Sequence, residues 1–412
     1  MAATGSRARS HRSNRRWALV GLLLTAILAL GIAGRLMSER VPPLQIKRLL
    51  AETLPIRGPR PKLVWPVDGE AAVEVEGLGS LGQSGPATPV PIASVAKVMT
   101  AYLTLRSYPL AAGSEGFELR VTAAEVGDER RRAALGESVV PVVAGELLSE
   151  RRALQALLIP SANNIAEMLA DHDAGSAAAF VARMNTTAHA LGMRSTTYTD
   201  PSGYDATTVS TPGDQLKLAA VAMREPAFAA IVDESAVDLP VAGEVDNYNG
   251  LVGHDGYVGI KTGSDGAAGG CLVFAKRVTV AGRRFTILGA VLGQRDGSYV
   301  PAALASAREL GDSAAAALRS GTVLPAGAGV LVARGADGKH ASVVTASALR
   351  EIGWGGLKVP VTVALTHAPT HLTAGQQVAI VTASGVALAS SRAVSARVLP
   401  APSLLWRLRH LL

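Results

Sequence analysis

A serine and a lysine three residues apart form the pair in this sequence whose spacing best suits nucleophilic chemistry. Ser94 and Lys97 lie in the apolar run 91–100, which predicts a helix, and side chains three residues apart share one helix face. A serine hydroxyl is a weak nucleophile until a base removes its proton. Lysine is such a base only when burial or a nearby cation lowers its pKa from about 10.4. The spacing nominates Ser94 as nucleophile and Lys97 as base; the alternative is a helix start with an exposed lysine.

A second polar pair follows a proline that interrupts a predicted helix. Ser161 and Asn163 come directly after Pro160, and a proline inside a helical pattern breaks the helix. A loop at such a break can direct a hydroxyl and a carboxamide into a cleft. Ser161 would then relay a proton to a leaving group, and Asn163 would hold a substrate amide with its donor and acceptor. The alternative is an ordinary helix cap.

A third stretch, Lys261-Thr262-Gly263, lies in the predicted strand 257–263. Glycine leaves room for a substrate to lie along the strand edge. Lys261 supplies a fixed cation suited to a substrate carboxylate, and a cation near Lys97 would depress the pKa of that lysine. These residues, together with Asn163, are the candidate substrate-binding group.

The order S-x-x-K, S-x-N, K-T-G is the set that penicillin-binding proteins and class A β-lactamases carry. Over residues 63–320 the chain resembles the serine D-alanyl-D-alanine carboxypeptidases, which are low-molecular-mass penicillin-binding proteins of peptidase family S11. The stretches that carry the resemblance are 91–101, 157–163, 191–193, 200–203, 210–214, 247–251 and 259–263.

This resemblance implies an enzyme that removes the terminal D-alanine from peptidoglycan stem peptides. It implies that Ser94 attacks the penultimate carbonyl with Lys97 as base, forming an acyl-enzyme, and that Ser161 helps to protonate the leaving amine. Backbone N–H groups would stabilise the oxyanion, one at Ser94 and one on the strand after Gly263, around Asp265.

The resemblance also implies the binding partners. Lys261 and Thr262 would bind the terminal carboxylate of the stem peptide, with Arg295 as a helper. β-Lactam antibiotics would act as inhibitors, and neither a metal nor another cofactor is required. His367 and His371 are four apart, but Pro369 between them excludes a helical zinc pair.

Three alternative functions remain open on the residues alone. A β-lactamase would use the same serine and a further glutamate to activate water; Glu225 lies in the right interval but in no recognisable motif. A DD-transpeptidase would differ only in its acceptor. A catalytically silent cell-wall-binding protein on the same fold is disfavoured because Ser94, Lys97 and Lys261 are all present.

The helices and strands that the sequence predicts around these residues indicate an α+β fold. We expect a β-lactamase/transpeptidase-like domain at 63–320, with an antiparallel sheet and helices on both sides, followed by a small all-β domain at 321–400. The patterns that support it are a hairpin in 63–86, a helix from Ser94 to about 105, a β segment at 138–143, helices after Ser149 and over 176–191, strands at 257–263, 272–280 and 285–292, and a helix at 301–318.

The charge of the 412-residue chain is concentrated at its two ends. The net charge is +7, but residues 1–16 carry five arginines and no acid, and residues 401–412 carry two arginines and no acid. The remainder balances to zero, which excludes a basic body for nucleic acid. The single cysteine, Cys271, excludes an intrachain disulfide.

The two charged ends predict a membrane protein. Residues 1–16 are a basic cytoplasmic tail, 17–37 a transmembrane anchor or signal segment, 38–62 a proline-rich linker and 401–412 an amphipathic tail that suits a membrane surface. We expect a single-pass protein of the bacterial cell membrane with its catalytic domain outside the cytoplasm. The alternative is secretion after cleavage at the small-x-small site 31–33.

Overall fold

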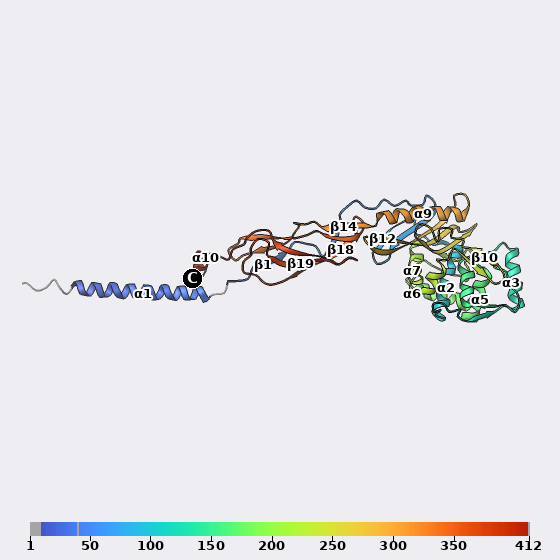
Figure 1. The fold of residues 1–412 in the computed structure, drawn as a ribbon, viewed down its shortest axis with the longest axis horizontal. Coiled ribbons are helices and arrows are strands. Elements are labelled where there is room, and N and C mark those ends of the chain that lie inside the picture. Colours follow the sequence, from blue (N-terminus) through green and yellow to red (C-terminus); the bar gives the residue numbers. More distant parts are fainter. Residues whose placement is uncertain (1–9, 39–40, 411–412) are drawn as a thin grey trace, which may run out of the picture. The chain divides into compact units, whose positions relative to one another are not determined.

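The computed structural model describes residues 10–38 and 41–410, and these fall into two compact units (Figure 1). Unit 1 contains the described residues up to 57, together with 322–351 and those from 357 onward. Unit 2 contains residues 58–321 and 352–356 and holds every candidate catalytic residue. Residues 1–9 of the predicted basic tail and residues 411–412 lie outside the described part of the chain.

Unit 2 is built around a five-stranded antiparallel sheet. Its strand order is β11-β12-β13-β3-β4, which confirms the predicted hairpin and the three later strands. The bounds are β3 (Glu70–Val75), β4 (Gly79–Ser84), β11 (Tyr257–Asp265), β12 (Gly269–Val280) and β13 (Arg283–Gln294).

Helices cover both faces of this sheet, as the α+β prediction requires. Helix α9 (Tyr299–Ala317) packs on β12 and β13, whereas α7 (Pro212–Ala222) packs on β13 and β3 from the other side (Figure 1). Alternation along β12 explains both contacts. Phe274 faces α9, where a Cβ atom at Gly311 would lie 3.1 Å from its ring, whereas Val273 belongs to the helical core.

The helical part of unit 2 surrounds α2 (Lys97–Ser107), whose residues Val98 and Met99 are buried in the main core. The other helices are α3 (Ala123–Ala134), α4 (Glu150–Leu158), α5 (Asn163–Ala174), α6 (Ala177–Ala190) and α8 (Pro226–Ile231). Short paired strands are β5 (Val90–Pro91) with β8 (Val209–Ser210), β6 (Glu118–Arg120) with β7 (Leu147–Ser149), and β9 (Ala236–Leu239) with β10 (Gly243–Asp246).

The prediction of a β segment at 138–143 is wrong, because this segment forms a loop. The backbone N–H and C=O of Val140 are satisfied by the side-chain amide of Asn164, at 3.2 and 3.0 Å, rather than by a neighbouring strand. A polar side chain on α5 thus replaces a strand partner. The loop carries Glu137 and Ser138 to the start of α5.

Unit 1 contains a seven-stranded sheet, so the predicted small β domain is larger than residues 321–400. The order is β1 (Gln45–Arg48), β15 (Gly329–Arg334), β16 (His340–Thr345), β20 (Ala389–Ser395), β19 (Gln377–Ala383), β18 (Lys358–Leu365) and β2 (Thr53–Pro55). Two further strands, β14 (Arg319–Leu324) and β17 (Leu349–Gly353), cross the division between the units.

The prediction of a linker over 38–62 is therefore wrong for residues 45–55. Strands β1 and β2 pair with β15 and β18 at the two edges of the sheet. The prolines do not prevent this, because a strand at a sheet edge tolerates proline and Pro55 ends β2. Leu44 and Ile56, which flank the two strands, are buried in the core of unit 1.

We expect Ile56→Ala to lower the free energy of unfolding of unit 1 by roughly 2–4 kcal/mol, because the side chain is 1% exposed and its loss leaves a cavity. The matched control is Leu49→Ala, at a side chain that is 52% exposed, for which we expect about 0.5 kcal/mol or less. Calorimetry of both variants measures the difference. Equal and small losses of unfolding free energy in the two variants would instead support a linker in this segment.

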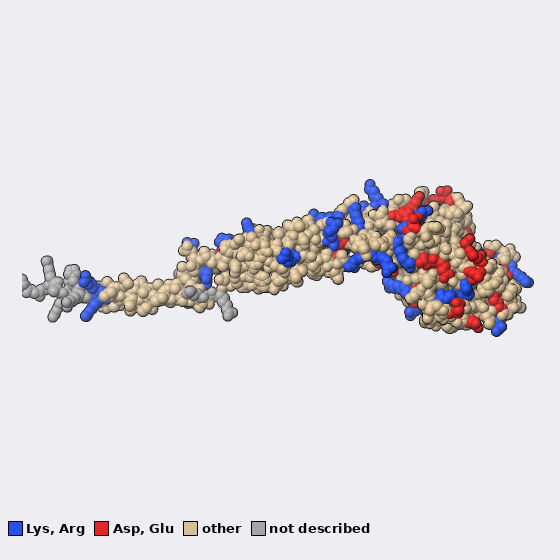
Figure 2. Space-filling model, in the orientation of Figure 1, with Lys and Arg blue, Asp and Glu red and all other residues tan. Residues whose placement is uncertain are grey.

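The N-terminal apolar segment is helical and continues into the basic tail. Helix α1 (Ser10–Ser38) contains the stretch Arg15–Leu36, which by length and composition can cross a membrane. These 22 residues rise about 33 Å, near the thickness of a hydrocarbon core, and Figure 2 shows no charged side chain along the middle of this helix. Helix α10 (Leu404–Arg409) is shorter than the predicted amphipathic tail, and Arg407 donates a hydrogen bond to the carbonyl of Leu36.

Candidate active site

Ser94 and Lys97 meet at the junction of two helices. Ser94 lies in the 3₁₀ turn η1 (Ala93–Ala96), and Lys97 is the first residue of α2. The predicted helix therefore begins one turn later than Ser94. Lys97 Nζ lies 2.7 Å from Ser94 Oγ, which confirms the contact that the spacing predicted.

Lys97 is enclosed completely, with an exposed fraction of 0%. Its amine also donates to Asn163 Oδ1 at 2.6 Å and to the carbonyl of Ser202 at 3.0 Å. Burial, and then the neighbouring charge of Lys261, lower the pKa of Lys97 well below its ordinary value. The side chain therefore has the position and the lowered pKa that a general base needs.

The loop 200–203 supplies the carbonyl that Lys97 contacts. Thr100 on α2 donates to the carbonyl of Pro201 at 2.6 Å, and Ser202 Oγ donates to Asp200 at 2.7 Å. Gly203 has φ +80°, and a Cβ atom there would lie 1.9 Å from the carbonyl oxygen of Ala93. Only glycine permits this approach of the loop to η1.

Ser161 and Asn163 lie at the break between α4 and α5, as predicted. Ser161 has φ +68°, in the left-handed region, and its buried hydroxyl has no hydrogen-bond partner among the described residues. Asn163 is the first residue of α5 and contacts Lys97 rather than the open cavity. Its prediction as a substrate-binding residue stays untested.

Lys261 is 1% exposed, and its amine has no hydrogen-bond partner within the described parts of the chain. Burial lowers its pKa to about 7. An anion that enters beside it would favour its charged form. This amine thus suits a carboxylate that arrives with a ligand.

Strand β11 approaches Ser94 closely because Gly263 has no side chain. A Cβ atom at Gly263 would lie 2.8 Å from the carbonyl oxygen of Ile92 and 2.9 Å from the backbone nitrogen of Ser94. The approach closes a cavity of about 240 Å³ beside the nucleophile. Its lining residues are Ser94, Ser138, Ser161, Tyr248, Thr262, Gly263, Ser264 and Val300.

The structure thus brings all seven predicted site residues into one region of unit 2. Ser94, Ser161, Thr262 and Gly263 line the cavity, whereas Lys97, Asn163 and Lys261 are buried and absent from its lining. Sequence reasoning missed Ser138, Tyr248, Ser264 and Val300. Of these, only Tyr248 lay in a stretch already noted for its resemblance.

Two helper positions from the sequence, and one residue considered for the β-lactamase alternative, do not line the cavity. Asp265 does not line the cavity, whereas the preceding residue on the same strand, Ser264, does, so the backbone N–H of Ser264 is the better-placed second oxyanion donor. Arg295 donates to the carbonyls of the same turn and does not line the cavity. Glu225 precedes α8 and is likewise not a lining residue.

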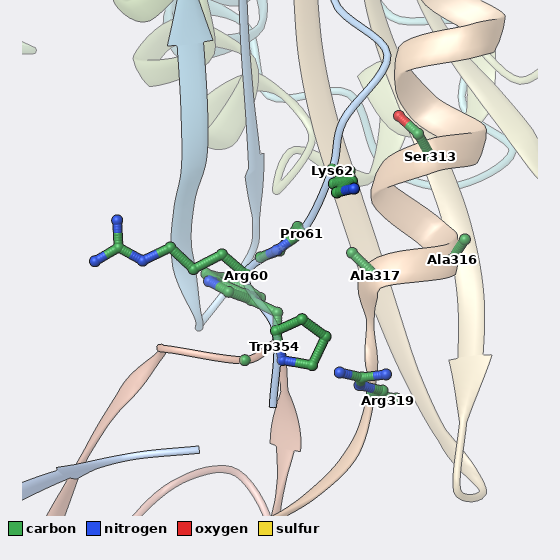
Figure 3. A pocket seen from close by; sticks show the side chains of 10 residues that line it. Arg60, Pro61, Lys62, Ser313, Ala316, Ala317, Arg319 and Trp354 are labelled. Carbon is green, nitrogen blue, oxygen red and sulfur yellow. The ribbon is translucent and has the colours of Figure 1, made fainter. Parts of the chain in front are cut away.

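A larger cavity, of about 490 Å³, lies at the carboxyl end of α9 within unit 2 (Figure 3). Arg60, Lys62, Arg319 and Trp354 line it, and it shares no residue with the Ser94 cavity. Its one hydroxyl, that of Ser313, accepts from the backbone of Val64 and donates to the carbonyl of Leu310. Without an activated nucleophile, this cavity is not the candidate active site.

Comparison with known families agrees with the geometry. The family model described as D-alanyl-D-alanine carboxypeptidase, peptidase S11, matches residues 79–294, just over half of the chain. The chain belongs to this family. The match includes Ser94, Ser161 and Lys261 with their motifs, and it confirms the resemblance found in the sequence.

Curated relatives match about two fifths of the chain. A D-alanyl-D-alanine carboxypeptidase from Streptomyces sp. strain K15 is 33% identical over 168 residues, 37% of this chain and 56% of the relative. A D-alanyl-D-alanine endopeptidase from Pseudomonas aeruginosa is 33% identical over 181 residues, 41% of this chain and 53% of the relative. The chain spans a little over half the length of these family members.

Solved structures support the fold of the family. The Streptomyces K15 DD-transpeptidase is similar with a TM-score of 0.53 and 26% identity, over 61% of this chain and 98% of that one. Penicillin binding protein 5 from Haemophilus influenzae has a TM-score of 0.57 at 19% identity and covers 82% of this chain and 99% of its own. The second likeness concerns the fold alone.

We expect Lys261→Met to change both ligand binding and pH dependence. Without this neighbouring positive charge the pKa of Lys97 rises, so the rate of acylation by penicillin, which needs neutral Lys97, reaches half its maximum at a higher pH. The variant should also lose roughly tenfold or more in acylation efficiency with a penicillin acid. A penicillin methyl ester, which lacks the carboxylate, is the matched control. Equal losses with acid and ester would contradict a carboxylate-binding role.

Proposed function

We propose that this family member is a serine D-alanyl-D-alanine carboxypeptidase that removes the terminal D-alanine from peptidoglycan stem peptides. The observation that carries the proposal is the 2.7 Å contact between Lys97 Nζ and Ser94 Oγ beside a cavity that the K-T-G strand closes. Family membership supports the same reading.

In the acylation step, neutral Lys97 takes the proton of Ser94 Oγ while that oxygen bonds to the penultimate carbonyl carbon. The N–H groups of Ser94 and Ser264 stabilise the oxyanion. The carbonyl is re-formed, the C–N bond breaks, and the leaving amine takes the proton from Lys97 through Ser161. Free D-alanine leaves an ester on Ser94.

In the deacylation step, water attacks this ester, and the proton that it loses returns to Ser94 Oγ by way of Lys97. The products are the shortened stem peptide and free enzyme. Lys261 and Thr262 bind the terminal carboxylate of the substrate, since Lys261 is a buried cation close enough to Lys97 to lower its pKa.

Hydrolysis of cross-links is the second candidate, because three of the relatives are named D-alanyl-D-alanine endopeptidases. The similar solved structure from Streptomyces K15 is named a DD-transpeptidase, so transfer to an amine must also be measured. The geometry gives no support to a β-lactamase, because Glu225 does not line the cavity. It gives none to a silent wall-binding protein either, because the nucleophile and base are in contact.

One assay separates these functions. Purified protein is offered a D-Ala-D-Ala stem peptide alone, then with an acceptor amine, and finally a cross-linked peptide dimer. We expect one free D-alanine per stem peptide, without a new amide. Release of monomers from the dimer, without release of D-alanine from the stem peptide, would favour the endopeptidase. Formation of a new amide with the acceptor amine would favour the transpeptidase. Rapid hydrolysis of penicillin with no action on any peptide would overturn the proposal in favour of a β-lactamase.

We also propose that α1 remains attached as a membrane anchor, with unit 2 outside the cytoplasm. The support is the uncharged stretch between Arg15–Arg16 and Arg35, whose arginine excess lies on the amino-terminal side. The mass of the mature protein from cell membranes tests this. A mass that includes residues 17–34 supports an anchor, and a mature chain that begins near Gly34 supports a cleaved signal.

A further inference from the structure

A buried carboxylate lies directly behind the catalytic cluster. Glu137, on the loop after α3, has a side chain only 2% exposed. One of its oxygens, Oε2, accepts a hydrogen bond from Asn163 Nδ2 at 2.7 Å and another from Arg132 at 2.9 Å. The sequence motifs give this glutamate no role, because it lies 24 residues before Ser161.

The carboxylate fixes which way the Asn163 amide points. An ionised carboxylate only accepts hydrogen bonds, so the group that faces Glu137 must be the NH₂ of Asn163. The amide oxygen is then turned toward Lys97, and it lies 2.6 Å from the amine. A flipped amide would place donor against donor at Lys97 and acceptor against acceptor at Glu137.

The orientation of Asn163 in turn determines where Lys97 presents its lone pair. A neutral amine has two N–H donors and one lone pair. Asn163 Oδ1 and the carbonyl of Ser202 are both acceptors and take the two N–H groups. The contact that remains is Ser94 Oγ at 2.7 Å, so the lone pair is directed at the proton that must be removed.

We propose that Glu137 is a positioning residue for the general base: it holds Asn163 so that the lone pair of Lys97 points at Ser94, and Arg132 balances its charge. This inference rests on the proposed function, since it assumes that Lys97 activates Ser94. It adds two residues to the working site, neither of which touches the substrate.

Arg132 is placed to balance that charge. It is 12% exposed and forms ion pairs with Asp128 at 2.5 Å and Glu137 at 2.9 Å, with Glu167 at 3.4 Å. Among the described residues, the formal charges with the largest effects on the pKa of Lys97 belong to buried or half-buried side chains. These groups are Lys261 and Arg132, which lower its pKa, and Asp200 and Glu137, which raise it.

These charges predict that two substitutions shift the pH at which the acylation rate rises, and that the two shifts have opposite directions. Arg132→Gln leaves the negative charge of Glu137 unbalanced, raises the pKa of Lys97 and moves the rise of the acylation rate to higher pH. Glu137→Gln keeps an oxygen that accepts a hydrogen bond from Asn163 but removes the negative charge. The pKa of Lys97 therefore falls, and the acylation rate rises at lower pH. Both charges act on Lys97 in the direction stated, and we expect each shift to be on the order of one pH unit.

The experiment measures acylation by a fluorescent penicillin from pH 5 to pH 10 in stopped flow, on the full chain in detergent. Arg131→Gln is the matched control, because Arg131 lies on the same helix, is 58% exposed and, in the described part of the chain, forms its ion pair with Asp128. Its profile should equal that of the wild type. Glu137→Ala, which removes the acceptor, should lower the maximal rate roughly tenfold or more.

Opposite shifts for Arg132→Gln and Glu137→Gln, with an unchanged Arg131→Gln, support the inference. The inference is overturned if the two variants acylate more slowly without a shift in their pH–rate profiles, or if both profiles shift in the same direction. Glu137 would then have a purely structural role. If Arg132→Gln does not fold, the near-isosteric Glu137→Gln carries the test alone. A wild type that penicillin does not acylate refutes the proposed function instead, which is a distinguishable outcome.

Discussion

Replacing Lys97 by methionine should lower the rate of acylation by penicillin about 10³-fold or more. The side chain is the only described base in contact with Ser94 Oγ, and general-base catalysis contributes roughly 10²–10⁴-fold. Methionine fills a similar volume without an amine. Stopped-flow acylation of the two proteins at equal pH measures the loss, and a loss below tenfold would assign the proton transfer to another group.

The fold should survive this substitution, and its stability gives an independent check on the pKa of Lys97. Burial lowers that pKa, so between the folded and unfolded pKa values the unfolded chain binds more protons. The wild type therefore loses stability from this group as pH falls through this window, whereas Lys97→Met has no such loss from position 97. We expect the melting temperature of the variant to gain on that of the wild type as pH falls. A constant difference would contradict a lowered pKa.

Replacing Gly263 by alanine should lower acylation roughly a hundredfold. The new Cβ atom would lie 2.8–2.9 Å from backbone atoms of Ile92, Ser94 and Val95, so β11 must move away from η1. A displacement near 1 Å at a reacting centre costs about this much. Penicillin acylation at saturating antibiotic measures the loss.

The matched control for Gly263 is Gly127→Ala. Gly127 lies within α3, and a Cβ atom there would meet nothing within 4 Å. Alanine at such a helical position should stabilise by about 0.5–1 kcal/mol and leave acylation unchanged. Normal acylation by Gly263→Ala would show that the strand tolerates a wider gap, which would contradict the close approach described above.

The motif residues were predictable because each lies in a short stretch with its own local signal. Ser94 and Lys97 share one turn, and the break at Pro160 marks the loop that holds Ser161. The packing around them was not predictable in the same way. Glu137 and Asn163 form a hydrogen bond although they lie 26 residues apart in the sequence. Glu137 lies on a loop whose apolar run has the pattern of a strand.

The role of the N-terminal segment was missed for a related reason. Strands β1 and β2 are four and three residues long and pair with partners more than 280 residues later. No local pattern specifies such pairing, and the nearby prolines favoured an extended linker. The buried Leu44 and Ile56 were the available signal, but two isolated apolar residues do not establish a core.

The most direct measurement is mass spectrometry of the protein after incubation with penicillin, followed by proteolysis to locate the adduct. We predict a stable adduct of one penicillin on Ser94, absent in Ser94→Ala. The substituted protein should melt at nearly the wild-type temperature. An adduct at another residue, or no adduct on folded wild-type protein, would contradict the assignment of Ser94 as nucleophile.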